Sequence, residues 1–301
     1  MSPLISVVIV NYNYRRFLAQ AIDSALAQTH PQVEVIVVDD GSNDGSLALL
    51  ESYGARIRWF EHQQLGVSAA RNRGIAECGG AFVAFMDADD YWRPDKLAKQ
   101  LQQFDDARVG MVYCGLQYVD ESGKPLSTNT EGRFGEVLVD LALMTAPGVP
   151  VGGSAAVVRR ECFHRVGEFD RELSTSADWD MWRRLACHYL IRIVPEPLAC
   201  YRQHGAAMHR NVELFEHDML HAFADMFSDP SAAAIHQLRR RCYGALFRTL
   251  AGSFWRVARW DKCLHYAVRS VLAWPPEIAY LTHYPLRQLR HRLRSTARSA
   301  G

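Results

Sequence analysis

The sequence predicts an α/β fold in which a mostly parallel sheet is flanked by helices and followed by a helical extension. Three observations support this fold class. Apolar runs of strand length alternate with amphipathic helical segments over the first third of the chain. The apolar runs are nearly continuous, which is typical of parallel strands buried on both faces. Beyond residue 210 the pattern is helical throughout.

The elements of the first half alternate strictly between strand and helix. Gly79 is placed to end the third helix, and Pro94 lies near the start of the fourth. Ligands of such sheets bind beyond the carboxyl ends of the strands, where the polar clusters of this sequence lie. Strands are expected at 4–10, 33–38, 56–62 and 81–86, and helices at 17–26, 47–53, 67–78 and 93–104.

The second half of the same domain has a less regular pattern. Strands are expected at 109–119, 152–160 and 191–202, with a helix at 178–189. Residues 145–154 are rich in glycine and proline and are expected to form a loop over the site. We therefore predict one domain over 1–210, with halves 1–108 and 109–210, followed by a helical, basic extension over 211–301.

Charge is distributed unevenly along the chain. The net charge of the 301 residues is only +1, from 34 lysines and arginines and 33 acids. Residues 231–301 nevertheless contain 13 of the basic residues and only two acids, Asp261 and Glu277. This asymmetry predicts an anionic partner for the C-terminal part. No nucleic-acid-binding signature occurs, so a membrane surface is the partner we expect.

The cysteines and the apolar runs indicate a cytoplasmic protein. The seven cysteines include no C-x-x-C pair and are expected to be free thiols in a reducing compartment. The sequence has no signal-peptide pattern and no apolar run of 18 residues, so no transmembrane helix is expected.

Acidic residues follow the fourth expected strand directly. Asp87 and Asp89 are separated by Ala88, and carboxylates two positions apart on an extended strand point the same way. Such a pair suits a hard divalent cation, Mn²⁺ or Mg²⁺, which shares its ligand shell with phosphates. The alternative interpretation is a solvated acidic turn that caps the next helix.

Polar residues at the other strand ends could hold a nucleotide. Asp39 and Asp40 end the second strand, where a carboxylate can accept hydrogen bonds from a ribose or a base; an Asx-turn is the alternative. Neither G-x-G-x-x-G nor a P-loop motif is present, which argues against a dinucleotide site and a P-loop NTPase.

Three residues outside the strand ends could take part in chemistry. Arg71, on the helix before the fourth strand, could reach a diphosphate, or form a surface ion pair. Asp178 shares a helix face with Met181 and Trp182 and is a candidate general base, or a partner of the helix dipole. His204 follows a strand and could be a third metal ligand, although a lone histidine is more often structural.

Taken together, these segments resemble the inverting nucleotide-sugar glycosyltransferases of family 2, which have the GT-A fold. The resemblance covers residues 4 to about 204. Singly the motifs are unspecific, but their shared order and spacing are specific. The motifs are SVVIVNYNY, VIVVDDGSNDGS, GVSAARNRGI, FMDADDYWRPDKL, SADWDMWRRLA and YRQH.

The resemblance implies a role for each matching residue. Asn11, Tyr12, Asp40 and Arg71 would hold the nucleotide. The D-x-D segment Asp87, Ala88 and Asp89 would hold the sugar nucleotide and the metal ion. Asp178 would be the catalytic base, and Trp179 and Trp182 would contact the acceptor. The family usually has Glu-Asp where this chain has Ala177-Asp178, which bears on the local acceptor contacts.

The implied reaction is metal-dependent transfer of a sugar, with inversion, from a nucleoside-diphosphate sugar to a hydroxyl of a glycan or lipid-linked acceptor. UDP is the expected nucleotide, with dTDP and GDP left open. One alternative is a sugar nucleotidyltransferase, which would release pyrophosphate. Another is a non-catalytic module that binds nucleotide-sugars or glycans.

The C-terminal segment 285–301 has arginines interleaved with leucines. Arg287, Arg290, Arg292 and Arg294 lie within eight residues. This pattern predicts an amphipathic helix that binds the cytoplasmic membrane face peripherally. The alternative is a solvated helical end.

Overall fold

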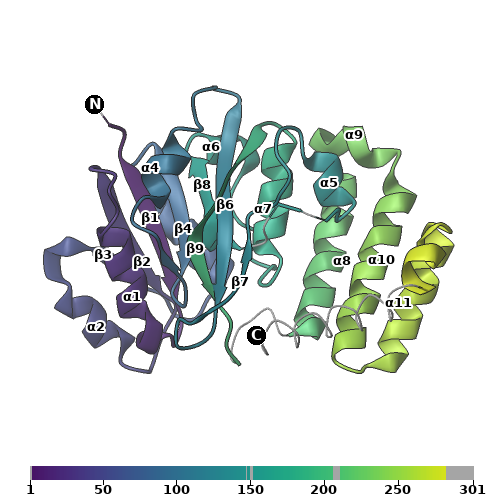
Figure 1. Cartoon of the computed structure of the whole chain (residues 1–301), viewed down its shortest axis with the longest axis horizontal. Coiled ribbons are helices and arrows are strands. Elements are labelled where there is room, and N and C mark those ends of the chain that lie inside the picture. The colour runs from purple at the N-terminus through teal and green to yellow at the C-terminus, as the bar shows by residue number, and fades with distance from the viewer. Residues whose placement is uncertain (1, 147, 150–151, 206–210, 283–301) are drawn as a thin grey trace, which may run out of the picture. The chain divides into compact units, whose positions relative to one another are not determined.

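The computed structural model describes residues 2–146, 148–149, 152–205 and 211–282, and the chain forms two compact units (Figure 1). The sheet unit comprises 1–141 and 145–222, and the helical unit comprises 142–144 and 223–301. The boundary lies inside helix α8 (Val212–Ser228) and not at the expected position 210/211. The reason is that the first part of α8 is fixed to the sheet unit, where buried Asp218 accepts four hydrogen bonds.

The sheet unit is built on one nine-stranded mixed sheet, with the order β3-β2-β1-β4-β8-β6-β9-β5 and with β7 paired to β6. Strands β1 to β4 are parallel to one another, as the alternating pattern predicts. Strand β9 is parallel to β6, whereas β5, β7 and β8 pair antiparallel. The strands are β1 Ile5–Asn11, β2 Val33–Asp39, β3 Arg58–Glu61, β4 Phe82–Asp87, β5 Tyr91–Trp92, β6 Val109–Val119, β7 Pro125–Asn129, β8 Ala156–Arg159 and β9 Leu190–Arg202.

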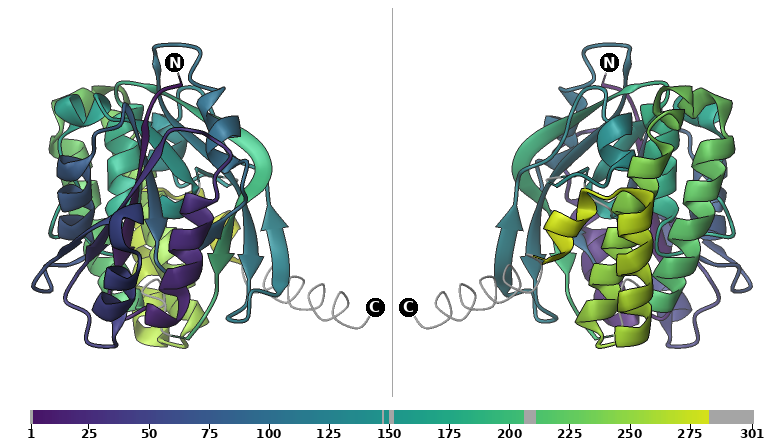
Figure 2. Two further views of the ribbon diagram at one scale, coloured as in Figure 1. Left: turned by 90° about the vertical axis from the view of Figure 1, so that its left-hand side faces the viewer. Right: turned by 90° about the vertical axis from the view of Figure 1, so that its right-hand side faces the viewer.

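The predicted α/β class is confirmed, and the helices lie on the faces of this sheet. Helix α1 lies in front of β1 and β2 in Figure 1, and Figure 2 (left) shows it beside α2. The helices of the sheet unit are α1 Arg15–Leu26, α2 Ser46–Ser52, α3 Val67–Glu77, α4 Lys96–Leu101, α5 Leu138–Ala142, α6 Cys162–Val166 and α7 Ala177–Ala186, with short 3₁₀ turns η1 Gly54–Arg56 and η2 Gly153–Ala155. The last residue of α5, Ala142, is counted with the helical unit.

The central strand β1 shows why these runs form a buried sheet. All seven of its residues are buried, and β2 and β4 pair with it on either side. Helix α3 packs very closely on it, because a Cβ at Gly74 would lie 2.2 Å from Cγ1 of Val8. Only glycine permits this approach of helix to strand. This close packing fixes the distance between α3 and the sheet, and with it the positions of the other side chains of α3.

The helical unit is formed from the last turns of α8 and the helices α9 Ala233–His236, α10 Arg239–Arg256 and α11 Trp260–Ala273, with the 3₁₀ turn η4 Pro230–Ala232. Helices α10 and α11 pack against each other, and the Ser270 hydroxyl donates a hydrogen bond to the Gly244 carbonyl. Arg248 forms an ion pair with Glu277 at 2.8 Å. No described helix has the length and hydropathy required to cross a bilayer. All seven cysteines are free, as expected.

Candidate active site

The site forms where α3, β4 and α7 meet, and a single guanidinium lies at its centre. Arg71 is 4% exposed, and its Nη2 donates a hydrogen bond of 3.0 Å to Oδ1 of Asp87. Its Nη1 lies 2.8 Å from Oδ1 of Asp178. Asp87 and Asp178 are 91 positions apart in the sequence, yet they contact the same side chain. The strand-end acid and the candidate base therefore belong to one cluster.

Three aromatic side chains pack against Arg71 and one another, and we call them the aromatic floor: Phe85, Phe169 and Trp182. The guanidinium of Arg71 lies 5.4 Å from the ring centroid of Phe169. Phe169 packs edge-to-face on Phe85, with ring centroids 5.3 Å apart, and Trp182 closes the group at 6.3 Å from Phe85. The floor excludes water from beneath Arg71, so the ion pairs above it are less screened than surface pairs.

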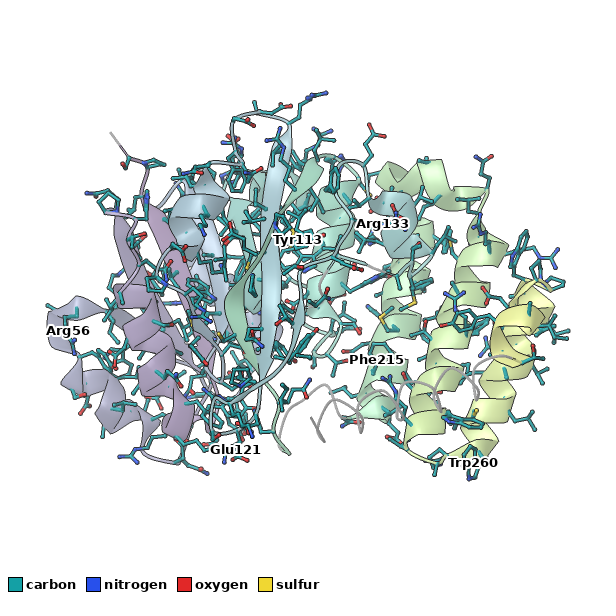
Figure 3. All side chains as sticks on the ribbon, in the orientation of Figure 1. Arg56, Tyr113, Glu121, Arg133, Phe215 and Trp260 are labelled. Atoms are coloured by element: carbon teal, nitrogen blue, oxygen red, sulfur yellow. The ribbon has the colours of Figure 1, made fainter. Side chains whose placement is uncertain are left out.

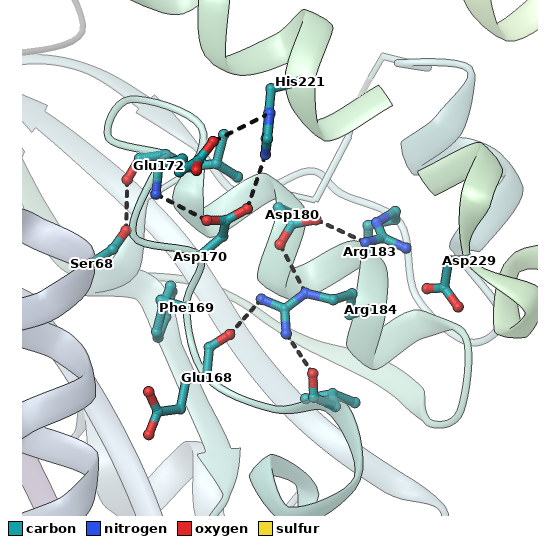
Figure 4. Close-up of polar contacts among 12 residues, drawn as sticks. Ser68, Glu168, Phe169, Asp170, Glu172, Asp180, Arg183, Arg184, His221 and Asp229 are labelled. Atoms are coloured by element: carbon teal, nitrogen blue, oxygen red, sulfur yellow. Dashed lines mark hydrogen bonds and ion pairs between the residues drawn. The ribbon is translucent and has the colours of Figure 1, made fainter. Parts of the chain in front are cut away.

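Helix α3 also fixes the segment that leads to Asp178. Asn72 holds Phe169 at both backbone atoms: its Nδ2 donates to the Phe169 carbonyl and its Oδ1 accepts from the Phe169 N–H, each at 2.8 Å. The Ser68 hydroxyl donates to the Leu173 carbonyl at 2.6 Å (Figure 4). Positions 68, 71 and 72 share one helix face, so this face holds both the segment and the acids.

The next three residues are held by α8. Oδ2 of Asp218 accepts hydrogen bonds from the N–H groups of Ser174, Thr175 and Ser176 and from the Thr175 hydroxyl, at 2.7 to 3.2 Å. Asp218 is completely buried. A carboxylate that satisfies several backbone donors just before a helix fixes where that helix begins. Helix α7 starts at Ala177, one residue before Asp178.

Helix α7 is fixed on its other side by a second acid. Asp180 is 2.8 Å from Arg183 and 2.8 Å from Arg184. Arg184 in turn donates hydrogen bonds to the carbonyls of Val166 and Glu168 (Figure 4). Asp180 therefore has a structural role, which distinguishes it from Asp178, two positions earlier on the same helix.

Three acids crowd the end of β4. Burial raises the pKa of Asp87 to about 6; Arg71 opposes this shift, and the charges of Asp178 and Asp89 add to it. Burial, together with the charges of Asp89 and Asp87, raises the pKa of Asp90 well above its usual range. Like charges at such close quarters repel one another, and a cation bound among them would offset that repulsion.

The segment after β9 completes the acidic group. Nε2 of His204 lies 2.8 Å from Oδ2 of Asp89, and the Arg202 N–H donates to Oδ1 of Asp90 at 2.8 Å. The Arg202 side chain donates to the Asp89 carbonyl, also at 2.8 Å. The imidazole of His204 packs against Phe17 and Tyr14. The structure thus places His204 beside the D-x-D segment, where a third ligand is expected.

The chemistry of the residues at the end of β4 suits a divalent cation. Among the described residues, however, the three ligand atoms that all lie within 4.8 Å of one another belong to Asp170, His221 and Asp225, and none comes from the D-x-D segment. Carboxylate oxygens of Asp87 and Asp89 and an imidazole nitrogen are a donor set that Mn²⁺ accepts and that Mg²⁺ accepts less readily. Nδ1 of His204 is buried and without a hydrogen-bond partner among the described residues. Burial is the main cause of the raised pKa values at Asp87 and Asp90, and the neighbouring carboxylates add to it.

The residues predicted to hold the nucleotide lie at the ends of β1 and β2. Nδ2 of Asn11 donates to Oδ2 of Asp39 at 2.6 Å, and Oδ1 of Asn11 is buried without a partner among the described residues. Both carboxylate oxygens of Asp40 accept backbone N–H groups, from Leu65 and Gly66. In this structure Asp40 therefore shapes the loop before α3. Tyr12 is 42% exposed.

The two tryptophans of α7 require a correction. Trp182 is completely buried and Trp179 is 4% exposed, so neither offers a surface for an acceptor. The amphipathic pattern of α7 turns both rings into the core, where Trp182 joins the aromatic floor. We therefore assign them to packing. Ala88 is likewise fully buried, and its backbone N–H donates to the Val10 carbonyl.

The sequence reasoning missed Ser154 and Asp218. The Ser154 hydroxyl accepts a hydrogen bond from the Asp87 N–H at 3.1 Å, and its carbonyl accepts one from Nε1 of Trp92 at 2.8 Å. Its place at the end of the predicted loop was the available signal, because residues 152–154 lie against the cluster. Residues 147, 150 and 151 of that loop lie outside the described residues. Asp218 gave no signal, since an aspartate within a helix is ordinarily solvent-exposed.

A comparison with protein families supports this assembly. The sequence profile described as "Glycosyl transferase family 2" matches residues 6–167, which is more than half of the chain. The match includes β1 to β4, the D-x-D segment and Arg71, and it ends before α7.

Named relatives agree with the profile. An uncharacterised glycosyltransferase of Nostoc sp. is 36% identical over 220 residues, covering 68% of this chain and 66% of the relative. One of Rickettsia typhi is 33% identical over 185 residues, covering 60% of this chain and 58% of the relative. The putative teichuronic acid biosynthesis glycosyltransferase TuaG of Bacillus subtilis is 36% identical over 128 residues, covering 41% and 51%. The matched region therefore spans less than two thirds of each relative.

Solved structures share the fold. S. aureus TarS residues 1–349, in complex with UDP-GlcNAc, superimposes with a TM-score of 0.69 at 17% identity, covering 90% of this chain and 81% of that one. The mannosyltransferase PcManGT of Pyrobaculum calidifontis, in complex with GDP-Man and Mn²⁺, gives 0.61 at 21% identity, covering 94% and 84%. At these identities the likeness establishes the GT-A-like fold alone.

Proposed function

Because this chain belongs to glycosyl transferase family 2, we propose that it is a glycosyltransferase that moves a sugar, with inversion, from a nucleoside-diphosphate sugar to an acceptor hydroxyl. One observation carries the proposal: Arg71 holds Asp87, at the D-x-D segment, and Asp178, 91 positions later, in the same cluster. A donor-binding group and a base must lie this close for a direct displacement.

The donor is proposed to be a nucleoside-diphosphate sugar, with UDP as the first nucleotide to test. The TarS structure contains UDP-GlcNAc and the PcManGT structure contains GDP-Man, so the fold accommodates both kinds of donor. Tyr12 and Asn11 are proposed to contact the base, which is supported by the exposed ring of Tyr12 and the unpartnered amide oxygen of Asn11.

A divalent ion is proposed at Asp87 and Asp89, with His204 beside them. Such an ion would supply Lewis-acid stabilisation of the departing diphosphate. The chain's own residues do the rest of the positioning there: Ser154 fixes the backbone at Asp87, and Arg202 fixes it at Asp89 and Asp90.

Asp178 is proposed as the general base that takes the proton of the acceptor hydroxyl. Hydrogen bonds from several elements fix the position of Asp178. Asn72 and Ser68 hold the segment that leads to α7, and Asp218 holds the residues directly before that helix. Arg71 orients the Asp178 carboxylate through the contact of 2.8 Å between Nη1 and Oδ1. Attack from the face opposite the leaving group then inverts the anomeric configuration.

The reaction product separates this proposal from the alternatives. Purified protein with Mn²⁺, a set of UDP-, dTDP- and GDP-sugars and glycan or lipid-linked acceptors should release a nucleoside diphosphate. Pyrophosphate release would identify a sugar nucleotidyltransferase instead. Donor binding with neither transfer nor donor hydrolysis would indicate a binding module and contradict the proposal.

The acceptor is proposed to be a glycan or a lipid-linked sugar, as the family resemblance implies. The predicted membrane contact of segment 285–301 falls on residues outside the described part of the chain and remains a prediction. So does the cytoplasmic location.

A further inference from the structure

Exposed apolar side chains are concentrated in the helical unit. Fourteen large hydrophobic residues of the described chain are exposed, and eight of these lie within residues 257–280. Single exposed hydrophobic residues are ordinary on any protein surface, but a concentration of this kind marks an interaction surface. The eight are Val257, Trp260, Leu264, Val268, Leu272, Trp274, Ile278 and Tyr280.

Four of them form a continuous stripe along α11, which we call the α11 stripe: Trp260, Leu264, Val268 and Leu272. Their exposed fractions are 56%, 68%, 49% and 71%. Steps of four residues keep side chains adjacent on a helix surface. The other face of α11 buries Tyr266 and Ser270 within the helical unit. Figure 3 shows Trp260 at the start of this helix, and Figure 2 (right) shows α11 in yellow-green. The helix is therefore apolar on two faces, and only one of them is covered within this unit.

The described sequence around the stripe is positively charged. Residues 239–282 contain eight lysines and arginines and two acids. Both acids already face arginines: Asp261 pairs with Arg259 at 3.1 Å and Glu277 with Arg248 at 2.8 Å. Four exposed arginines lie near the stripe in the sequence. Arg240 and Arg241 are at the start of α10, Arg256 is at its end, and Arg269 is within α11.

We infer that the α11 stripe is a membrane-binding surface that inserts into an anionic lipid bilayer. Apolar side chains along one helix face enter the headgroup–acyl boundary, and the surrounding arginines bind anionic headgroups. Trp260 is suited to the interface, where an aromatic ring with a polar N–H is favoured. A second copy of this chain is a poorer occupant, because two such cationic surfaces would repel each other.

This surface is distinct from segment 285–301, which the sequence alone suggests. It is formed by described residues of a packed helix and depends on leucine, valine and tryptophan as much as on charge. Membrane binding does not require sugar transfer, so the inference and the proposed function can fail separately.

The test is vesicle co-flotation of the full chain. Vesicles of phosphatidylcholine with 30% phosphatidylglycerol, a composition chosen at about the anionic content of a bacterial membrane, are compared with pure phosphatidylcholine. The double variant Leu264→Gln/Leu272→Gln removes two exposed apolar side chains of the stripe. Leu126→Gln/Phe134→Gln is the matched control, since these residues are also exposed, at 53% and 70%, but lie in the sheet unit. Circular dichroism and thermal unfolding establish that each variant is folded.

Wild type should float with anionic vesicles and not with neutral ones. The stripe variant should need at least about tenfold more lipid for half-maximal binding, because two apolar side chains no longer insert. The control variant should stay within about twofold of wild type. Both variants are at surface positions, so nucleoside diphosphate release should be unchanged.

Three results would overturn the inference. The first is wild type that does not float with anionic vesicles. The second is a stripe variant that floats like wild type while neutralising Arg287, Arg290, Arg292 and Arg294 to glutamine abolishes flotation, which would assign the contact to the tail. The third is a stripe variant that turns a wild-type dimer into a monomer in sedimentation velocity without changing flotation, which would assign the stripe to a second copy.

Discussion

At the scale of single residues, the site depends on one arginine that holds two acids from distant parts of the chain. Asp87 was recognisable from its place after an apolar run, and Asp178 from its helix face. Their contact through Arg71 could not be predicted, because nothing in a sequence states that positions 91 apart share a partner. The same holds for Ser154, whose hydroxyl meets the backbone of Asp87.

We predict that Asp89→Ala removes both activity and its dependence on Mn²⁺ or Mg²⁺. The remaining donors near His204 would no longer hold an ion, and the charge of the leaving diphosphate would be unopposed. Titration of nucleoside diphosphate release against metal concentration measures this.

Asp95→Ala is the matched control, because the side chain of this acid is 45% exposed and pairs with Lys99. The control should keep the metal response of wild type. An Asp89→Ala protein that still responds to Mn²⁺ with normal turnover would show that the ion, if used, binds elsewhere.

At the scale of elements, the position of α7 depends on α8. Asp218→Ala leaves three backbone N–H groups and the Thr175 hydroxyl without their acceptor, so the segment before Asp178 should loosen. We expect turnover to fall about 10- to 100-fold, as misplacement of a catalytic group by an ångström does. Donor affinity should change less than twofold, since the donor residues lie on other elements.

Steady-state kinetics with separate donor titration measure both quantities. Glu213→Ala, an exposed site on the same helix, is the control. Asp218→Asn keeps one carbonyl acceptor and should recover part of the turnover. If donor binding and turnover both fall in proportion to the loss of stability, Asp218 has a purely structural role and does not position Asp178.

Helix α4 contains a buried lysine whose titration should be measurable. Lys96 is completely buried, and its Nζ lies 3.8 Å from the ring centroid of Trp92. Burial lowers its pKa to about 8, from 10.5 in a model peptide. The folded chain thus releases this proton at lower pH than the unfolded chain. Below pH 8 Lys96 is charged in the folded chain, and burying that charge lowers the free energy of unfolding. Stability should rise as pH increases from about 8 to 10.5.

Lys96→Met should remove this cost and keep the packing on Trp92. Its free energy of unfolding at pH 7 should exceed that of wild type by about 1–3 kcal/mol, and the advantage should shrink above pH 8. Chemical denaturation at pH 7 and pH 9.5 measures both. Loss of stability at pH 7 would mean that the ammonium group is favourably placed where it is.

Long elements were predictable and short ones were not. The expected strands at 109–119 and 191–202 match β6 and β9 to within one residue, because both are long and apolar. Strand β5 has only two residues, and β7 is exposed and begins with Pro125, so neither has a periodic pattern. The antiparallel pairings of β8 also lay beyond the sequence, since its residues resemble those of a parallel core strand.

At the scale of the whole molecule, two compact units differ in composition and surface. The sheet unit contains every residue proposed to bind donor or metal. The helical unit has a net positive charge, with 13 lysines and arginines against four acids, and it carries the α11 stripe. The break between them lies within α8, where no change of composition marks it, so the sequence placed it about twelve residues too early.

Ligand binding should stabilise the sheet unit. A nucleoside diphosphate with Mn²⁺ at 100 times its dissociation constant adds about 2.7 kcal/mol, which corresponds to a rise of a few degrees in the melting temperature of a domain of this size. Differential scanning calorimetry with UDP, dTDP and GDP would also identify the nucleotide. Addition of EDTA, or the Asp89→Ala substitution, should abolish the rise. A rise that survives both would remove the metal from donor binding.

The most direct test of the account is the single-turnover rate of Asp178→Asn, measured together with its donor affinity. Asn keeps the shape but cannot accept the proton, so transfer should slow by roughly 10²–10⁴-fold while donor affinity stays close to wild type. Asp180→Asn, two positions later and paired with Arg183 and Arg184, should lose stability but keep most of its turnover per folded molecule. A transfer rate for Asp178→Asn within threefold of wild type, or a loss of donor binding with normal transfer from bound donor, would contradict the assignment of the base.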